Sequence, residues 1–306
     1  DAAPLTAVPS LVTDASPPYD LVILERAPVA ARYLGPLKRA CPDLSVIFDT
    51  QDVHHIRFAR HAEIAGSRRL RRDADAMRRM ERDAISAADL TWVVSTYERD
   101  QVAALCPDAA LDVLPLIVEP DPLPTPFPSR AGLLFIGGFQ HAPNHDAVHH
   151  FVRDIWPDIA AALPKATFSI VGSDPPADIR ALGGDRVRVL GHVEDLTPLL
   201  SAARLSVAPL RFGAGVKGKI ATSLAHGLPC VASPVAVEGS GLACGTDILC
   251  AETERDFARA VVNLYTDESL WTRLSGAGVD FVARTYAMAA IAPRLESALR
   301  RLRVIA

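Results

Sequence analysis

Short apolar segments alternate with helical segments along most of the chain, and this alternation limits the possible folds more than any other feature of the sequence. Residues 19–24 and 44–49 are apolar enough to be buried strands, and residues 28–40 between them are typical of a helix. A strand, a helix and a second strand at this spacing form a parallel βαβ unit. Further elements are expected as a long helix at residues 57–83 and as strands at residues 90–95 and 113–118.

A proline-rich segment at residues 120–128 interrupts the alternation, because proline can continue neither a helix nor a central strand. The pattern then starts again with a strand at residues 132–138, a helix at 143–163 and a strand at 166–172. Later strands are expected at residues 187–191, 205–210, 229–233 and 247–250, and later helices at 253–265, 268–286 and 289–302.

We therefore predict an α/β fold with two doubly wound, Rossmann-like domains. The expected parts are a tether at residues 1–18, a short first domain at 19–128, a second domain at 129–285 and a closing helix at 286–306. Because the sequence begins at Asp1 and not at a methionine, we expect the chain to be part of a longer protein.

The composition excludes several classes of protein. Apolar residues make up 49% of the 306 residues, which is enough for buried cores. The net charge of −4 argues against a general nucleic-acid binder, which needs a dominant positive field. No apolar run approaches the ~20 residues that span a bilayer. The five cysteines contain no C-x-x-C pair, so we expect reduced thiols in a cytoplasmic protein, without a disulfide framework or a zinc ribbon.

A glycine-rich turn between a strand and a helix, within residues 209–239, has the features of an anion site. Gly213, Gly215 and Gly218 would let backbone N–H groups come close to a ligand, and the following helix would direct its positive end at the same place. Lys217 and Lys219 add two full charges. The turn is therefore suited to a phosphate group.

Three interpretations of this turn are open. The glycines match G-x-G-x-x-G, with Glu238 about twenty residues further on, as in a dinucleotide fingerprint, but several strands precede the turn where the fingerprint would open its domain. The second interpretation is an ordinary βα turn with two solvated lysines. The third is the phosphate site of a nucleotide sugar.

Polar residues follow the second strand of the first domain, where parallel sheets bind ligands. The segment D-T-Q-D-V-H-H places Asp52 and His54 there, and a carboxylate beside an imidazole could orient a hydroxyl group and remove its proton. The alternative is structural: Asp52 would be the N-cap of a helix with His54 and His55 on its first turn.

Two further groups of residues have structural and functional interpretations. The arginine-rich residues 68–82 carry acids at helical spacing, which favours a solvated face, although contact with an anionic membrane surface or a polyanionic acceptor is the alternative. His145 and His149 share a helical face. With no carboxylate or cysteine nearby in the sequence, we do not expect them to bind a metal. His141 and Asn144 lie on the loop after a strand and should face a ligand cleft.

Taken together, six segments resemble the nucleotide-binding half of GT-B glycosyltransferases, in particular the large retaining family 4 that includes many bacterial cell-envelope enzymes. The segments cover nearly all of residues 130–285. They are F-I-G-G-F-Q-H-A-P-N-H-D-A-V at 135–148, F-S-I-V-G-S at 168–173, V-R-V-L-G-H-V at 187–193, L-S-V-A-P-L-R-F-G-A-G-V-K-G-K-I at 205–220, H-G-L-P-C-V-A-S at 226–233 and E-G at 238–239. The segment F-D-T-Q-D-V-H-H-I-R-F-A-R at 48–60 is similar to a subset of the same enzymes.

The resemblance implies a GT-B fold whose two domains face a cleft, and a second domain that binds a nucleotide-diphosphate-sugar donor without metal or cofactor. Lys217, with Lys219 as second choice, would meet the donor diphosphate. The remaining donor-binding candidates are Gly137, Gly138, His141, Asn144, Gly213, Gly215, Thr222 and Glu238. The first domain would supply the acceptor side around Asp52 and His54, and the last helix would cross back onto it.

The sequence departs from the family in two places. The usual pair of glutamates, separated by seven residues, is replaced by Ala214 and Thr222. The first domain is also short, since nothing before Tyr19 resembles the strand and glycine-rich loop with which these enzymes begin. The resemblance therefore implies a truncated first domain, or strands supplied by another region of a longer protein.

The hypothesis is a hexosyltransferase-type glycosyltransferase that moves a sugar from a nucleotide sugar to a glycan or a lipid-linked acceptor during polysaccharide biosynthesis. We expect a cytoplasmic protein, with peripheral membrane contact through residues 68–82 as the alternative to a solvated helix, and no nucleic-acid partner. Two alternatives stay open: a GT-B binding or scaffold module that has lost catalysis, and a sugar-nucleotide epimerase.

Overall fold

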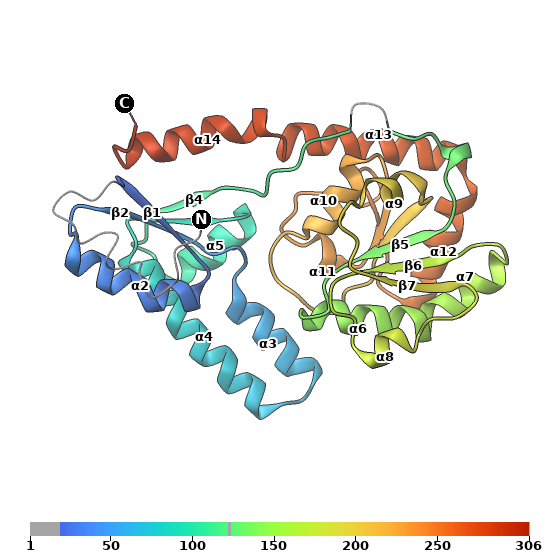
Figure 1. Cartoon of the computed structure of the whole chain (residues 1–306), viewed down its shortest axis with the longest axis horizontal. Coiled ribbons are helices and arrows are strands. Elements are labelled where there is room, and N and C mark those ends of the chain that lie inside the picture. The colour runs from blue at the N-terminus through green and yellow to red at the C-terminus, as the bar shows by residue number, and fades with distance from the viewer. Residues whose placement is uncertain (1–18, 122–123, 306) are drawn as a thin grey trace. The chain divides into compact units, whose positions relative to one another are not determined.

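The computed structural model describes residues 19–121 and 124–305, which fold into two compact α/β units (Figure 1). The first unit contains the described residues up to Pro115, together with Ala214–Val216 and the residues from Ile291 onward. The second unit contains Leu116–Gly213 and Lys217–Ala290. The predicted tether at residues 1–18 lies outside the described part of the chain.

A parallel sheet of four strands, in the order β1-β2-β3-β4, forms the centre of the first unit. The strands are β1 (Leu21–Glu25), β2 (Ser45–Asp49), β3 (Leu90–Val93) and β4 (Leu111–Val113). The helices are α2 (Ala27–Ala40), α3 (His54–Ile64), α4 (Arg68–Ala87), α5 (Thr96–Leu105) and most of α14 (Met288–Arg301).

Both faces of this sheet are covered, which explains why its strands are apolar along their whole length. Successive residues of β2 point to opposite faces. Val46 and Phe48 are fully buried in a cluster with residues of α2 and α4. Ile47, between them, is buried against β3 and against Ala298 of α14, which lies along the other face in Figure 1.

Two expectations for the first unit are wrong. The single helix predicted at residues 57–83 is two helices, because Gly66 adopts a left-handed conformation (φ 59°) that ends α3, and the Ser67 hydroxyl then accepts a hydrogen bond from Leu70 N at 3.4 Å to begin α4. The strand predicted at residues 113–118 ends at Val113. Pro115 has no N–H group and cannot extend the ladder.

The second unit contains a parallel sheet of six strands in the order β10-β9-β8-β5-β6-β7. The strands are β5 (Leu133–Ile136), β6 (Phe168–Val171), β7 (Val187–Gly191), β8 (Leu205–Ala208), β9 (Cys230–Ala232) and β10 (Leu249–Cys250). The chain builds outward from β5 to β7 and then returns to place β8 on the other side of β5. The carboxyl ends of β5 and β8 are therefore the topological switch point, where doubly wound sheets bind ligands.

Helices cover both faces of the second sheet. One face packs against α6 (Ala142–His150), the π-helical turn Phe151–Ile155, α7 (Trp156–Ala162) and α12 (Glu254–Thr266). The remaining helical elements of this unit are the 3₁₀ turn Phe127–Ser129, α8 (Ala177–Arg180), α9 (Thr197–Ala202), α10 (Gly218–Ala225), α11 (Pro234–Val237) and α13 (Glu268–Thr285). The helix predicted at residues 143–163 is interrupted by the π-helical turn, because Pro157 offers no N–H group and crowds the preceding turn.

The buried side chain of Arg130 forms hydrogen bonds with several separate segments of the second unit. Its guanidinium group donates hydrogen bonds to the carbonyl oxygens of Thr125 at 2.6 Å, of Leu200 at 2.6 Å and of His226 at 2.8 Å. The side chain therefore joins the start of the unit to the ends of α9 and α10. Burial lowers the pKa of Arg130 to about 10, so the group stays charged at neutral pH.

The expectation of reduced cysteines is wrong for one pair. Cys244 and Cys250 form a disulfide with a Cα–Cα distance of 5.5 Å, whereas Cys41, Cys106 and Cys230 are not disulfide-bonded. The turn between the paired residues is closed by a hydrogen bond from Gly245 N to Ile248 O at 2.7 Å, with Gly245 at a φ of 84°. This turn brings the two cysteines together at a spacing that a search for C-x-x-C does not detect.

Among residues 19–121 and 124–305, no helix is both long and apolar enough to cross a bilayer.

Candidate functional site

The loop after β5 lies at the switch point of the second unit and leaves no room for side chains at its first glycine. A Cβ on Gly137 would lie 2.7 Å from Asn144 Cγ and 2.7 Å from Lys219 Nζ. At the end of β6, a Cβ on Gly172 would lie 2.0 Å from Gly137 O. Glycine at these positions allows a close approach of backbone and polar groups that other residues would block.

Two predicted residues from separate helices meet at this loop. Asn144, on the first turn of α6, donates from Nδ2 to Gly138 O at 2.8 Å, and its Oδ1 accepts a hydrogen bond from Lys219 Nζ. The Lys219 ammonium also lies 4.3 Å from the ring centroid of Phe135 on β5. The structure thus brings Gly137, Gly138, Asn144 and Lys219 into one cluster.

The environment of Lys219 makes its charge responsive to a ligand. Burial of the ammonium lowers the pKa of Lys219 to about 7, and the nearby charge of Lys217 acts in the same direction. A bound anion would favour the charged ammonium and raise this pKa. Lys219 is therefore half-charged near neutral pH before a ligand binds and would become fully charged beside a phosphate group.

The start of α10 adds further positive character. Lys217 is the N-cap residue of this helix, and a Cβ built on Gly213 would lie 3.3 Å from Lys217 Cε, so the lysine stem lies against the glycine turn. Gly218 and Lys219 are the first residues of α10, and backbone N–H groups at a helix start are suited to bind an anion. The sequence ranked Lys217 ahead of Lys219, but Lys219 is the residue whose ammonium contacts the loop after β5.

The remaining donor candidates are distributed around these elements. His141 is the N-cap residue of α6, and its N–H group donates to Gly138 O at 3.4 Å. Thr222 lies on the second turn of α10, and Glu238 directly follows α11; both side chains are half-buried. Gly215, at a φ of 72°, belongs to the segment that groups with the first unit.

In the first unit, Asp52 and His54 are neighbours in space, as the sequence suggested. Nδ1 of His54 lies 3.2 Å from Asp52 Oδ1 and 3.0 Å from the backbone oxygen of Asp52, while Asp52 Oδ2 lies 3.0 Å from Arg57 Nε. The interpretation of Asp52 as an N-cap is wrong, because α3 begins after Val53 and has no side-chain cap. The carboxylate instead joins His54 to Arg57.

Glu81 is the residue that the sequence reasoning missed. This buried carboxylate accepts hydrogen bonds from the backbone N–H groups of His54 at 2.7 Å and His55 at 3.2 Å, and lies 2.5 Å from His55 Nδ1. Burial alone would raise the pKa of Glu81, but the hydrogen bonds from His54 and His55 outweigh it and lower the pKa to about 2.

A signal for Glu81 was present in the helical periodicity of α4. Glu81 falls on the same face as Ala74, Ala84 and Ile85, which are buried, while the arginines of α4 are exposed. A carboxylate on the apolar stripe of a helix needs partners, and the backbone after β2 supplies them. Glu98 is a second such group, since it accepts hydrogen bonds from Val53 N at 3.1 Å and Val94 N at 3.2 Å.

Two parallel α/β units, of which the second is doubly wound and has a glycine-rich cationic site at its switch point, define the GT-B class of fold. Residues 130–267 match the family model for "Glycosyl transferases group 1". Among curated protein sequences, none matches the chain significantly.

Solved structures of GT-B glycosyltransferases share the fold over almost the whole chain. Sucrose-phosphate synthase from Thermosynechococcus elongatus has a TM-score of 0.78 at 18% identity, covering 98% of this chain and 77% of that one. HepE from Anabaena, in complex with UDP and glucose, has a TM-score of 0.72 at 13% identity, covering 97% and 80%. TarM has a TM-score of 0.71 at 12% identity, and the chain spans 54% of its length. The predicted fold is confirmed.

Proposed function

We propose that this chain is a glycosyltransferase that moves a sugar from a nucleotide-diphosphate donor to a glycan or a lipid-linked acceptor. The observation that carries the proposal is the enclosed ammonium of Lys219, held against Asn144 and the glycine loop at the switch point of the second unit. The family match of residues 130–267 supports the reaction class, and the HepE structure with the same fold contains UDP and glucose.

In the proposed reaction, the bond between the anomeric carbon of the sugar and the β-phosphate oxygen breaks, and a bond from that carbon to the acceptor oxygen forms. The leaving diphosphate gains negative charge as this happens. Lys219, Lys217 and the first N–H groups of α10 are suited to stabilise that charge, a form of preorganised electrostatic catalysis that requires no metal ion.

The acceptor hydroxyl must lose a proton, and we assign His54 to receive it. Three oxygens surround His54 Nδ1: the backbone oxygen of Asp52 at 3.0 Å, Asp52 Oδ1 at 3.2 Å and Glu81 Oε1 at 3.5 Å. These acceptors favour the tautomer with the proton on Nδ1, which leaves Nε2 as a base. Asp52 would orient the ring in this role.

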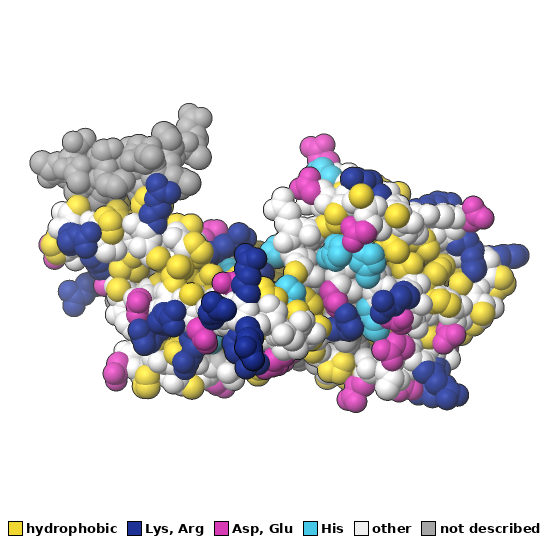
Figure 2. Space-filling view, turned by 90° about the horizontal axis from the view of Figure 1, so that it is seen from below, with side chains coloured by type: hydrophobic (Ala, Val, Ile, Leu, Met, Phe, Trp, Pro, Cys, Tyr) yellow, Lys and Arg dark blue, Asp and Glu magenta, His cyan; other side chains and the backbone are white. Residues whose placement is uncertain are grey.

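The proposed setting is bacterial cell-envelope polysaccharide synthesis at the cytoplasmic side of the membrane. The arginines of α4 support peripheral contact with an anionic surface, because they are exposed along the helix. Figure 2 shows Lys and Arg side chains, in dark blue, gathered over the first unit. Acidic side chains lie among them, which is also compatible with a solvated helix.

One observation favours a binding module as the second candidate. Ala214 and Thr222 occupy the positions where the family resemblance implies glutamates, so the carboxylates expected near the donor sugar and ribose are replaced. A module that binds a nucleotide sugar without turning it over would keep the lysines and lose those carboxylates.

Calorimetry with UDP-, GDP- and dTDP-sugars, followed by assays for free nucleotide and transferred sugar, tests the proposal. We expect one donor to bind and to turn over, at least slowly by hydrolysis. Binding without any turnover would favour the binding module, and failure of every donor to bind would contradict both. Conversion of the donor sugar without acceptor would indicate an epimerase.

A further inference from the structure

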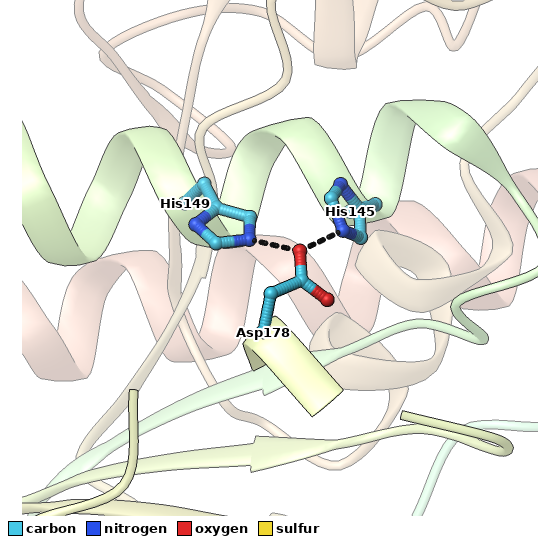
Figure 3. Close-up of side chains that lie close together, drawn as sticks. All are labelled: His145, His149 and Asp178. Atoms are coloured by element: carbon cyan, nitrogen blue, oxygen red, sulfur yellow. Dashed lines mark hydrogen bonds and ion pairs between the residues drawn. The ribbon is translucent and has the colours of Figure 1, made fainter. Parts of the chain in front are cut away.

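Three side chains of the second unit converge on its surface, away from the contacts of Lys219. His145 and His149 lie one turn apart on α6, with ring centroids 4.7 Å apart, and both direct Nε2 toward Asp178 on α8 (Figure 3). Asp178 Oδ2 lies 2.6 Å from His145 Nε2 and 2.8 Å from His149 Nε2. One ligand atom from each residue lies within 4.8 Å of the other two.

From the sequence alone, these two histidines have no identified third ligand, which is why metal binding is not expected. The fold removes that objection, since β6 and the loop that follows it carry Asp178 to the side of α6. Two imidazole nitrogens and one carboxylate oxygen form a ligand set typical of zinc sites that keep an open position for water.

Exposure and geometry both suit an ion at this place. The side chains of His145, His149 and Asp178 are 37%, 34% and 51% exposed, so an ion could enter and retain solvent ligands. Ligand atoms that surround one ion at metal–ligand distances of about 2.0–2.2 Å lie farther from one another than these three atoms do. Small rotations of the exposed side chains would separate the three atoms enough to admit an ion. Nothing in their packing opposes that movement, because all three reach the surface; histidine side chains are visible in cyan on the second unit in Figure 2.

We propose that His145, His149 and Asp178 bind a divalent transition-metal ion such as Zn²⁺, with water completing the coordination. The ion would join α6 to α8 and so connect the loop after β5 with the loop after β6. Asn144, which contacts the glycine loop, directly precedes His145 in α6. The turn after Gly172 leads into α8, and Asp174 Oδ2 in this turn accepts a hydrogen bond from Gln140 at 3.1 Å. The ion would have a structural role, linking these segments, and takes no part in the proposed sugar transfer.

The test uses the full chain without a histidine tag, freed of metal by chelator and titrated with Zn²⁺ in a calorimeter and with Co²⁺ in a spectrophotometer. We expect one equivalent of Zn²⁺ to bind and one equivalent of Co²⁺ to produce visible absorption bands. His149→Ala and Asp178→Asn should each weaken Zn²⁺ binding by at least about tenfold, since even loss of a group that only supports a metal ligand costs that much. Circular dichroism checks that both variants fold.

His192→Ala is the control, because His192 is an exposed histidine of the same unit outside the cluster. This variant should bind both ions like the parent. Failure of the parent to bind Zn²⁺ in a saturable equivalent, or unchanged affinity in both His149→Ala and Asp178→Asn, would overturn the proposal. Because no sugar nucleotide is present, the outcome does not depend on whether the proposed transferase activity is correct.

Discussion

If Lys219 meets the donor diphosphate, the affinity for UDP must fall as the pH rises above neutrality. The free protein holds the pKa of Lys219 at about 7, against an ordinary value of 10.5, because the ammonium is buried and Lys217 lies nearby. A diphosphate beside the ammonium favours the charged form and raises the pKa in the complex. UDP therefore binds best when Lys219 is already protonated. Above pH 7, where most of the free Lys219 is uncharged, Lys219 must take up a proton when UDP binds.

The size of the effect follows from the pKa shift. Between the pKa of the free protein and that of the complex, affinity falls by about tenfold per pH unit. If the complex restores the pKa to near its ordinary value, UDP should bind about 50-fold more weakly at pH 9 than at pH 7, or ~2.3 kcal/mol. At pH 8, binding should take up about 0.9 proton, since only about a tenth of free Lys219 is charged there.

Calorimetry at pH 7, 8 and 9, in two buffers with different ionisation enthalpies at each pH, measures both quantities. This range lies above the pKa of about 6 of a terminal phosphate, so the charge of the diphosphate itself is nearly constant. Lys219→Met should bind UDP weakly and without proton uptake, whereas Lys165→Met, which alters an exposed lysine of the same unit, should behave like the parent. Parent protein that binds UDP with pH-independent affinity and without proton uptake would show that Lys219 does not meet the phosphates.

Further predictions concern three residues. Lys217→Ala should remove most sugar transfer and leave the circular dichroism spectrum intact; transfer at the parental rate would refute the assignment. Glu81→Gln should lower the free energy of unfolding at pH 7 by ~1–3 kcal/mol, because backbone N–H groups lose a charged acceptor. Because the pKa of Glu81 is lowered from 4.5 to about 2, its contribution to the free energy of unfolding is present above pH 4.5 and is lost as the pH falls toward 2. In urea denaturation, the free energy of unfolding should therefore decrease less between pH 5 and pH 3 in the variant than in the parent. Equal decreases in the two proteins would contradict this prediction. Arg130→Met should lower the free energy of unfolding by about 3–5 kcal/mol, because several buried carbonyl oxygens lose their donor. Urea denaturation would measure this, and a change under 1 kcal/mol would mean that water replaces the guanidinium.

The periodicity of the sequence predicted most of the elements, because a buried parallel strand must be apolar on both faces. Boundaries were predicted less well. The break at Gly66 and the π-helical turn before Pro157 each arise from one residue within an otherwise helical pattern, and both residues are visible in the sequence. Closer attention to glycine and proline would have placed these interruptions.

The site shows the same division between what is local and what is not. The glycine loop after β5 and the two lysines at α10 could be identified in the sequence, since their chemistry depends on neighbours in the chain. The lowered pKa of Lys219 could not, because burial causes it and the contacts of the ammonium with Phe135 and Asn144 come from other elements.

The sequence by itself determined the parallel α/β class, the repetition of the strand and helix pattern on both sides of a proline-rich segment, and the glycine-rich turn with two lysines before α10, for which it predicts phosphate binding. Only the tertiary structure decided that Glu81 holds the backbone at His54 and that Asp178 meets His145 and His149. Hydrophobic periodicity and backbone freedom are properties of short segments. The partner of a buried or converging charge is instead set by which distant segments the sheet order brings together, and that order is not written in any one of them.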